Sequence, residues 1–444
     1  MESIESQPKN RLVVFSWAFY DFANTIFSMN VVSMYFPLWI IQDLGREDIW
    51  VSGAHFLSMA LVAISMPVLG AISDQIRRRM PFLIGLTVVS ALFTALIGLV
   101  GKSGISPQTR VFSALLFFVV ANYSYHGGLV FYNALLPQVS TPQTMGKISG
   151  YGVALGYLGA IVGLILVMPF NEGSLFGIQV PFIRGGGRVA TFVPTGFFFF
   201  IFSLPTFLWI RDRVTAESTG LKVNWGEGWR RVQLVIRNMD RYPGVFRFLV
   251  AKFCYENAIS AVIVFMAVYA VKVMGFSDAL VLPFFIVSTV SATLGSLACG
   301  WMVDRLGPKR ILNLVLLGWI FSLCLVLATD NRWVFWCAGS LIGIFMGATW
   351  TSARPLLVTL VPGEMLGEFF GLYSFSGKAA AIFGPLIWGL VVLCFRGLDI
   401  LKYKFAVGAL LILICIGLAI LWRVPDRWSS ARIFAEQRAM GERE

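Results

Sequence analysis

Residues 70–79 read GAISDQIRRR, and residues 300–310 read GWMVDRLGPKR. In both stretches an Asp follows a Gly by four positions, and a basic pair comes shortly after the Asp. The two stretches lie 230 residues apart in a chain of 444 residues, and each separates two long apolar segments. This spacing indicates a duplicated chain, in which each half contributes its own set of membrane helices.

The composition excludes a soluble globular protein. Hydrophobic residues make up 57% of the chain and charged residues only 13%, whereas soluble domains carry about a quarter charged residues. The sequence therefore predicts an all-α membrane protein with twelve transmembrane helices in two pseudo-symmetric six-helix bundles. Apolar runs of about 20 residues place these helices at 12–42, 50–73, 81–101, 110–136, 147–170, 191–210, 246–273, 279–303, 310–329, 333–361, 367–395 and 404–423.

The runs also divide the chain into five segments. These are an N-terminal tail (1–11), a first bundle (12–210), a basic linker (211–245), a second bundle (246–423) and a C-terminal tail (424–444). The linker is rich in Arg and Trp, and residues 226–239 are expected to form an amphipathic helix along the membrane surface. It serves either as an anchor to anionic lipids or as a binding site for a regulatory partner.

The net charge of +12 raises the question of nucleic acid binding, but the distribution of the charge argues for membrane topology instead. The tails and the loops after even-numbered spans hold 22 Lys and Arg residues, against 10 in the other loops. By the positive-inside rule, both termini face the cytoplasm. We expect no nucleic acid partner, and a location in the inner or plasma membrane if the source is bacterial.

A duplication of six-helix halves indicates a transporter with its site between the repeats, and the repeated loops are predicted to gate it. Gly lets two helix ends approach closely, and Asp with a basic pair can form an interhelical ion pair. The alternative is a stop-transfer cluster with an incidental Asp. The pattern resembles the loop signature of the major facilitator superfamily, which assigns gating to Gly70, Asp74, Arg78, Arg79, Gly300, Asp304, Lys309 and Arg310.

Further segments resemble one branch of that superfamily, the vacuole-effluxer-like proteins, which include the autophagy-related amino-acid exporters of fungi and their bacterial relatives. The matching segments are YDFAN at 20–24, FYNALLP at 131–137, GKISG at 146–150, EFFGLY at 368–373 and SGK at 376–378. The resemblance implies the major facilitator fold and secondary active export of a small solute, plausibly an amino acid, by alternating access. It implies no enzymatic activity and no cofactor.

Ionisable and amide side chains inside predicted spans are expected to bind substrate or coupling ions. In the first half, Asp21 and Asn24 share a helical face of span one, and Asn122, His126 and Asn133 share a face of span four. Asp21 is a site for a proton or a substrate amine, or else a buried structural residue. For His126, a hydrogen-bonded packing role is favoured over a role as a proton carrier.

In the second half, the candidates are Glu256 with Asn257 in span seven, Arg354 in span ten and Lys378 in span eleven. Lys252 stands four residues before Glu256, so these two side chains either neutralise each other or serve transport. Arg354 suits a two-pronged grip on a substrate carboxylate, or else bridges helix carbonyls. We expect the site at midplane between spans 1, 4, 7 and 10.

Other site chemistries find little support in the sequence. Two histidines without an acidic cluster predict no metal site, and the Gly-rich stretch at 184–188 lacks the Lys-Ser/Thr of a phosphate loop. Transport is then driven by a solute or ion gradient, with protons as the candidate coupling ion. The competing interpretations are export of another organic solute or drug, and a non-transporting sensor or assembly protein that keeps the fold.

Overall fold

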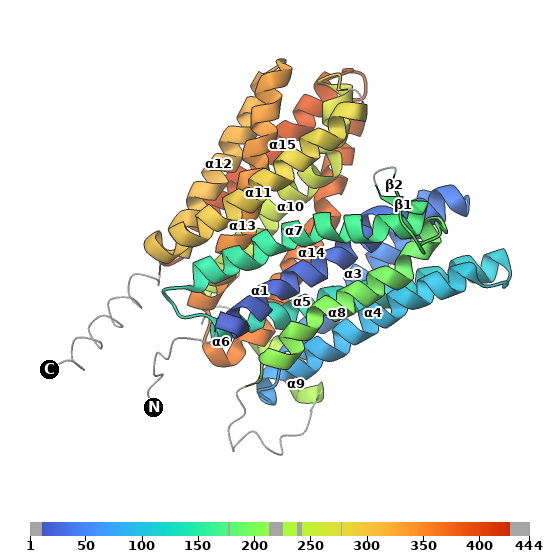
Figure 1. The fold of residues 1–444 in the computed structure, drawn as a ribbon. Coiled ribbons are helices and arrows are strands. Elements are labelled where there is room, and N and C mark those ends of the chain that lie inside the picture. Colours follow the sequence, from blue (N-terminus) through green and yellow to red (C-terminus); the bar gives the residue numbers. More distant parts are fainter. Residues whose placement is uncertain (1–10, 176–177, 213–224, 238–241, 277, 427–444) are drawn as a thin grey trace. The chain divides into compact units, whose positions relative to one another are not determined.

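The computed structural model describes residues 11–175, 178–212, 225–237, 242–276 and 278–426 (Figure 1). Its first-half elements are α1 (Arg11–Phe27), η1 (Ser28–Tyr35), α2 (Phe36–Leu38), η2 (Trp39–Asp43), α3 (Asp48–Gln75), α4 (Met80–Lys102), α5 (Pro107–Ala134), α6 (Leu136–Val139), α7 (Met145–Glu172), β1 (Ser174–Leu175), β2 (Ile178–Gln179), η3 (Arg188–Thr191) and α8 (Phe192–Trp209). The second-half elements are α9 (Trp225–Arg237), α10 (Pro243–Lys272), α11 (Asp278–Leu306), α12 (Pro308–Ala328), α13 (Arg332–Leu360), η6 (Gly363–Met365), α14 (Leu366–Cys394) and α15 (Leu401–Trp422).

Within the described residues, twelve helical stretches are long and apolar enough to cross a membrane. This confirms the predicted number of spans. The first stretch, Arg11–Asp43, includes the π-helical segments η1 and η2. The linker helix α9 also forms, close to the predicted 226–239, while residues 213–224 and 238–241 of the linker lie outside the described residues.

The chain divides into two compact units. The first comprises residues up to 139 and 155–228, and the second comprises residues 140–154 and those from 229 onward. The first turns of α7 therefore belong to the second unit by their contacts, and the remainder of α7 belongs to the first.

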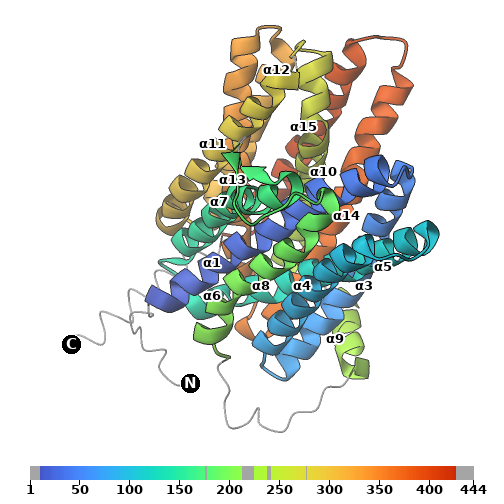
Figure 2. The same cartoon turned by 45° about the vertical axis from the view of Figure 1, so that its right-hand side comes forward.

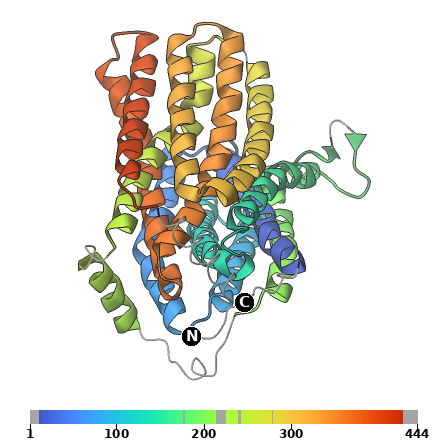
Figure 3. The ribbon, with the colours of Figure 1, turned by 90° about the vertical axis from the view of Figure 1, so that its left-hand side faces the viewer.

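Each unit packs its helices in the same pairs. In the first unit α1 packs on α8, α4 on α8, α4 on α5, and α3 on α5. In the second unit the equivalent spans pair likewise, α10 with α15, α12 with α15, α12 with α13, and α11 with α13. Figure 2 shows α4 beside α5, and Figure 3 shows the second-unit helices α11, α12 and α15, coloured yellow to red. The recurrence of all four pairs is the structural counterpart of the repeated loops.

A fifth equivalent pair packs closely at glycines, since small residues let two helix backbones approach. On α7, a Cβ at Gly159 would collide with the carbonyl oxygen of Phe22 on α1. On α14, a Cβ at Gly384 would collide with the carbonyl oxygen of Asn257 on α10. The backbones of both pairs approach so closely that only glycine fits at these two positions.

The core of the first unit is aromatic. Phe36 stacks on Phe118 of α5 at a centroid distance of 4.2 Å, and Trp39 meets Phe192 of α8 edge to face. These side chains are 3% exposed or less. Each buried aromatic ring removes a large apolar area from solvent. These contacts therefore stabilise the packing of span one against spans four and six.

Candidate functional site

The first unit holds a buried polar group that we call the Asp21 cluster, comprising Asp21, Asn24, Ser28 and Tyr125. Asp21 and Asn24 are 5% and 3% exposed, and both lie on α1. The Tyr125 hydroxyl of α5 interacts with Ser28, Asn24 and Asp21. The Oδ1 atom of Asn24 has no hydrogen-bond partner among the described residues. The cluster therefore offers a carboxylate and an unused amide oxygen, both suited to a cation or an amine.

Span four supplies the other predicted polar residues of this half. Asn122 is fully buried and donates from Nδ2 to the Ser58 hydroxyl at 2.7 Å, with His55 Nδ1 at 3.4 Å. His126 is half-buried and meets the Tyr125 ring edge to face. The Oδ1 atoms of Asn122 and Asn133 have no hydrogen-bond partner among the described residues. The structure joins Asn122 to α3, and it brings His126, through Tyr125, next to the Asp21 cluster.

The second unit holds a larger group that we call the Lys252 cluster, comprising Lys252, Glu256, Arg354, Tyr373 and Lys378. Lys252 Nζ lies 2.5 Å from Glu256 Oε2, which confirms the pairing expected from their spacing. The ammonium also sits 4.0 Å from the centroid of the Tyr373 ring. Lys378 interacts electrostatically with Glu256 and Lys252, and Arg354 with Tyr373. Two lysines thus act on the Glu256 carboxylate, and Arg354 acts on the neighbouring Tyr373.

Asn257 is buried beside this cluster on α10. Its Nδ2 atom donates to the Phe253 carbonyl oxygen at 2.6 Å, and its Oδ1 atom has no hydrogen-bond partner in the described part of the chain. The pairing of Lys252 with Tyr373 was not predicted. To predict that a cation lies over an aromatic ring, one must know which helix faces α10. The sequence alone does not give that information.

The first repeated loop is held by an internal network. Asp74 pairs with Arg79 at 2.9 Å, and the Asp74 side chain is only 2% exposed. Arg79 Nη1 also donates to the Ala134 carbonyl oxygen at the end of α5, at 2.9 Å. Arg78 is exposed, so Arg79 alone of the predicted basic pair makes the ion pair. The network joins the end of α3 to the end of α5.

Asp212 completes this network and was missed from the sequence. Its carboxylate accepts the backbone N–H groups of Arg79 and Met80, which caps the start of α4. Burial raises the pKa of Asp212 above its ordinary value, although both N–H bonds and the charges of Arg79 and Arg78 act in the opposite direction. Residue 212 lies 132 positions beyond Met80, and no local pattern links the two.

The second repeated loop differs from the first, and here the predicted ion pair is wrong. Asp304 accepts the backbone N–H groups of Gly146 at 2.6 Å and Lys147 at 3.0 Å, and so caps the first turn of α7. A carboxylate is favoured at a helix N-terminus because the free N–H groups and the helix dipole present positive charge there. Lys309 instead donates to the Trp422 carbonyl oxygen, and Arg310 pairs with Asp426.

Two glycines permit that cap. A Cβ at Gly300 would lie 2.7 Å from the Gly146 carbonyl oxygen, and a Cβ at Gly146 would lie 2.6 Å from the Gly300 carbonyl oxygen. Since both values are below ordinary contact distances, the two backbones touch directly. Gly300 therefore serves close helix approach, as predicted for the repeated loops, and the Gly70 carbonyl oxygen accepts a hydrogen bond from the Ser73 hydroxyl.

Comparison with known proteins identifies the architecture. Residues 51–431 match the family model described as "Vacuole effluxer Atg22 like". The chain is 24% identical to the MFS-type transporter YxiO of Bacillus subtilis, over 94% of this chain and 95% of that protein. It is 21% identical to Autophagy-related protein 22 of Eremothecium gossypii, over 85% of each protein.

Solved structures show the same fold at lower sequence identity. An outward-facing bacterial homologue of the iron transporter ferroportin superposes with a TM-score of 0.72 at 14% identity, covering 95% of this chain and 99% of that one. The human organic anion transporter MFSD10 superposes with a TM-score of 0.72 at 15% identity, covering 94% of this chain and 100% of that one. The proton:xylose symporter XylE superposes with a TM-score of 0.68 at 13% identity, covering 94% of this chain and 96% of that one. The fold is that of the major facilitator superfamily.

Proposed function

Because the chain belongs to the vacuole effluxer Atg22-like family, whose members include major-facilitator transporters, we propose that it exports a small zwitterionic solute of the amino-acid class by alternating access. It is an integral, multi-pass membrane protein. Transporters built from structural repeats place polar binding groups at membrane depth and expose them to each side in turn. The two buried clusters supply such groups.

The opposite chemistry of the two clusters carries this proposal. The Asp21 cluster offers a carboxylate and the free Asn24 amide oxygen, which bind an ammonium group. The Lys252 cluster combines Lys252, Lys378 and Arg354 with the single carboxylate of Glu256, so its basic side chains outnumber its acidic ones and suit a substrate carboxylate. Ammonium and carboxylate groups occur together in amino acids, and Arg354 suits a two-pronged grip on the carboxylate.

Proton coupling is assigned to Asp21. A carboxyl group that is 5% exposed in a membrane helix changes its charge when it exchanges a proton for a substrate amine. Export against a substrate gradient then draws on the proton gradient. The Asp21 carboxylate binds either the proton or the amine, so the two ligands compete for one group.

A binding screen followed by a transport assay tests the proposal. Purified protein is heated with amino acids, peptides, sugars and organic acids, because a ligand raises the melting temperature of the state that it binds. Positive compounds are then followed in proteoliposomes with and without a pH gradient. Stabilisation by sugars alone, or transport that ignores the pH gradient, would contradict the proposal.

The excess of cations in the Lys252 cluster favours a second candidate, an organic anion without an amine. MFSD10, a structural relative, is described as an organic anion transporter. N-acetylated amino acids separate the two candidates, since they keep the carboxylate and lose the amine. An amino-acid exporter should discriminate strongly against them, whereas an organic anion exporter should accept them.

We also propose that both termini face the cytoplasm, in line with the excess of Lys and Arg in the tails and even-numbered loops. Cysteine introduced at Arg230, an exposed position of α9, should react with a membrane-impermeant thiol reagent only from the cytoplasmic side. Cysteine introduced near residue 434, outside the described residues, should behave in the same way. Labelling of either position from the opposite side would reverse the orientation.

A further inference from the structure

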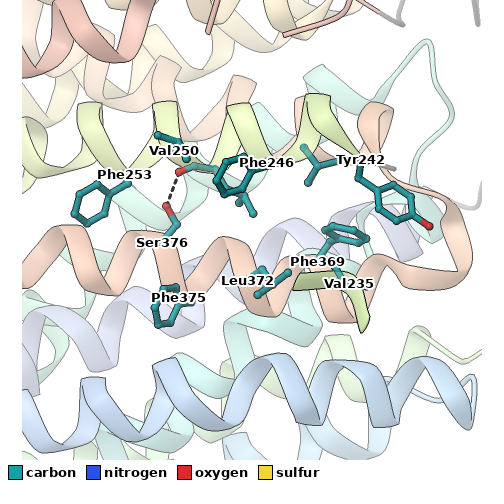
Figure 4. A pocket seen from close by; sticks show the side chains of 11 residues that line it. Val235, Tyr242, Phe246, Val250, Phe253, Phe369, Leu372, Phe375 and Ser376 are labelled. Atoms are coloured by element: carbon teal, nitrogen blue, oxygen red, sulfur yellow. Dashed lines mark hydrogen bonds between the residues drawn. The ribbon is translucent and has the colours of Figure 1, made fainter. Parts of the chain in front are cut away.

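An apolar pocket of about 310 Å³ lies within the second unit, between the first turns of α10 and α14 (Figure 4). Val245, Leu249 and Val250 line it from α10, and Phe369 and Leu372 line it from α14. Val235 of the linker helix α9 closes the end that carries Tyr242, while Phe253 and Phe375 lie toward the opposite end.

The pocket offers almost no hydrogen bonding to a ligand. Ser376 donates its hydroxyl hydrogen to the Leu249 carbonyl oxygen at 2.9 Å, and the Tyr242 hydroxyl contacts Met365 Sδ at 3.5 Å. The other lining side chains are all apolar. A polar solute would lose its hydration without compensation in such a pocket, whereas a hydrocarbon chain would not. The pocket is therefore unsuited to a zwitterionic solute.

The pocket has the length and position of one lipid tail. It lies along the first turns of two membrane spans, which begin at Gly244 and Gly363. The lining residues of α10 run from Tyr242 to Phe253, which corresponds to about 16 Å of helix. The hydrocarbon region of one leaflet is about 15 Å thick.

Basic residues occur close in sequence to the lining residues at the end of the pocket where the spans begin. Arg237 follows Val235 by two residues on α9 and is exposed, and Arg247 follows the lining residue Phe246 and is exposed. Arg247 Nη1 donates to the carbonyl oxygen of Arg423, which is also exposed. Arginine beside a membrane surface attracts anionic lipid headgroups. Two exposed arginines therefore stand within two positions of lining residues at this end of the pocket.

From these observations we propose that the pocket is a specific site for an anionic phospholipid, with one acyl chain between α10 and α14 and the headgroup phosphate on Arg237 and Arg247. The linker helix α9 then acts as a lid over a bound lipid rather than as a nonspecific surface anchor. This lipid site is proposed to be separate from the substrate site, and the proposal does not depend on which solute is transported.

Lipid retention by the purified full-length protein tests this site. The protein is incubated in detergent with equal amounts of phosphatidylglycerol and phosphatidylcholine, and the bound lipids are counted by native mass spectrometry. Wild-type protein should retain phosphatidylglycerol preferentially. Arg237→Gln should reduce that preference about five-fold, as expected for one arginine near an anionic surface, and Arg396→Gln, on an exposed loop after α14, should leave it unchanged.

Filling the pocket should remove both lipids. Leu372→Trp places a ring in the cavity and should lower the retained lipid at least ten-fold, while the matched control Leu314→Trp, on the exposed face of α12, should retain it. Equal retention by the two Trp variants would overturn the site. Phosphatidylglycerol carrying a photoreactive acyl chain gives a test on unaltered protein. Its adducts should concentrate at 245–253 and 369–376, and an even spread that includes α12 would refute the proposal.

Discussion

Asp304 and Gly146 are joined by a hydrogen bond of 2.6 Å between the Asp304 carboxylate and the Gly146 backbone N–H. The equivalent residue in the first repeat, Asp74, makes an ion pair with Arg79 instead. One sequence signature therefore supports two contacts. In one copy the carboxylate neutralises a side chain, and in the other it caps a helix.

The two aspartates should differ in their contribution to stability. Asp74→Asn leaves Arg79 buried beside a neutral amide and should lower the free energy of unfolding by about 3 to 5 kcal/mol. Asp304→Asn keeps one acceptor for the start of α7 and should cost about 1 to 2 kcal/mol. Thermal unfolding in detergent measures both, with Asp330→Asn as the control because its pair with Lys404 is exposed. Equal losses for Asp74 and Asp304 would contradict the distinction.

Asp212 should make stability depend on pH. The pKa of Asp212 is raised in the folded protein. Its contribution to the free energy of unfolding is therefore complete below the ordinary aspartate pKa of 3.8, and it is lost as the pH rises through the folded pKa. Asp212→Asn mimics the protonated form and removes this titration. The melting temperature of the variant relative to wild type should therefore be higher at about pH 7 than at about pH 4. A constant difference would show that Asp212 does not titrate in this range.

Asp21→Asn should abolish accumulation of substrate driven by a pH gradient. The substitution keeps the shape of the side chain and removes the charge, so the protein should still insert, fold and bind weakly. Uptake in proteoliposomes with and without the gradient is the measurement. Asn24→Ala provides the comparison, since it removes a ligand of the amine but keeps the carboxylate. Normal coupled transport by Asp21→Asn would leave Asp21 a structural residue.

Glu256→Gln should act mainly on stability. It leaves Lys252, which is 2% exposed, without its carboxylate partner, and the expected cost is about 3 to 5 kcal/mol. The double variant Lys252→Met/Glu256→Gln removes both charges and should recover much of the loss. Thermal unfolding of the two variants gives the comparison. A double variant no more stable than Glu256→Gln would show that Lys252 is not the cause.

Three glycines of α14 should respond differently to the same substitution. A Cβ at Gly384 meets the backbone of Asn257, which cannot move aside, so Gly384→Ala should separate α14 from α10 and strongly destabilise the protein. At Gly377 the Cβ would lie 2.5 Å from Glu256 Oε2, so the variant should disturb the ion pair. Gly389 has open space, and Gly389→Ala should be neutral or should stabilise the helix by up to about 1 kcal/mol. Expression and melting temperature give the ranking.

The sequence predicted well those features that depend on short-range spacing. Apolar runs located twelve spans because a membrane helix must be continuous and apolar. The spacing of Lys252 and Glu256 predicted their pairing because residues four apart share a helical face.

Contacts between distant segments escaped prediction. Asp212 and Asp304 each cap a helix that is more than 100 positions away, and any acid in a loop would have matched the sequence equally well. The choice of Arg79 over Arg78 depends on which side chain the turn directs inward. Tyr125 was not singled out as a ligand because its neighbours on α1 become visible only when α1 and α5 are packed.

The π-helical segments of span one alter how that span must be compared with others. A π-helix closes its hydrogen bonds over five residues, so each of its turns holds more residues than an α-turn. The angular position of every side chain after Phe27 is therefore displaced from the one obtained by counting at 3.6 residues per turn. A helical wheel that places Asp21 and Asn24 correctly will misplace Asn30 and Tyr35. An alignment of this span with a relative that is α-helical throughout requires a gap, even where the two segments are equally long in space.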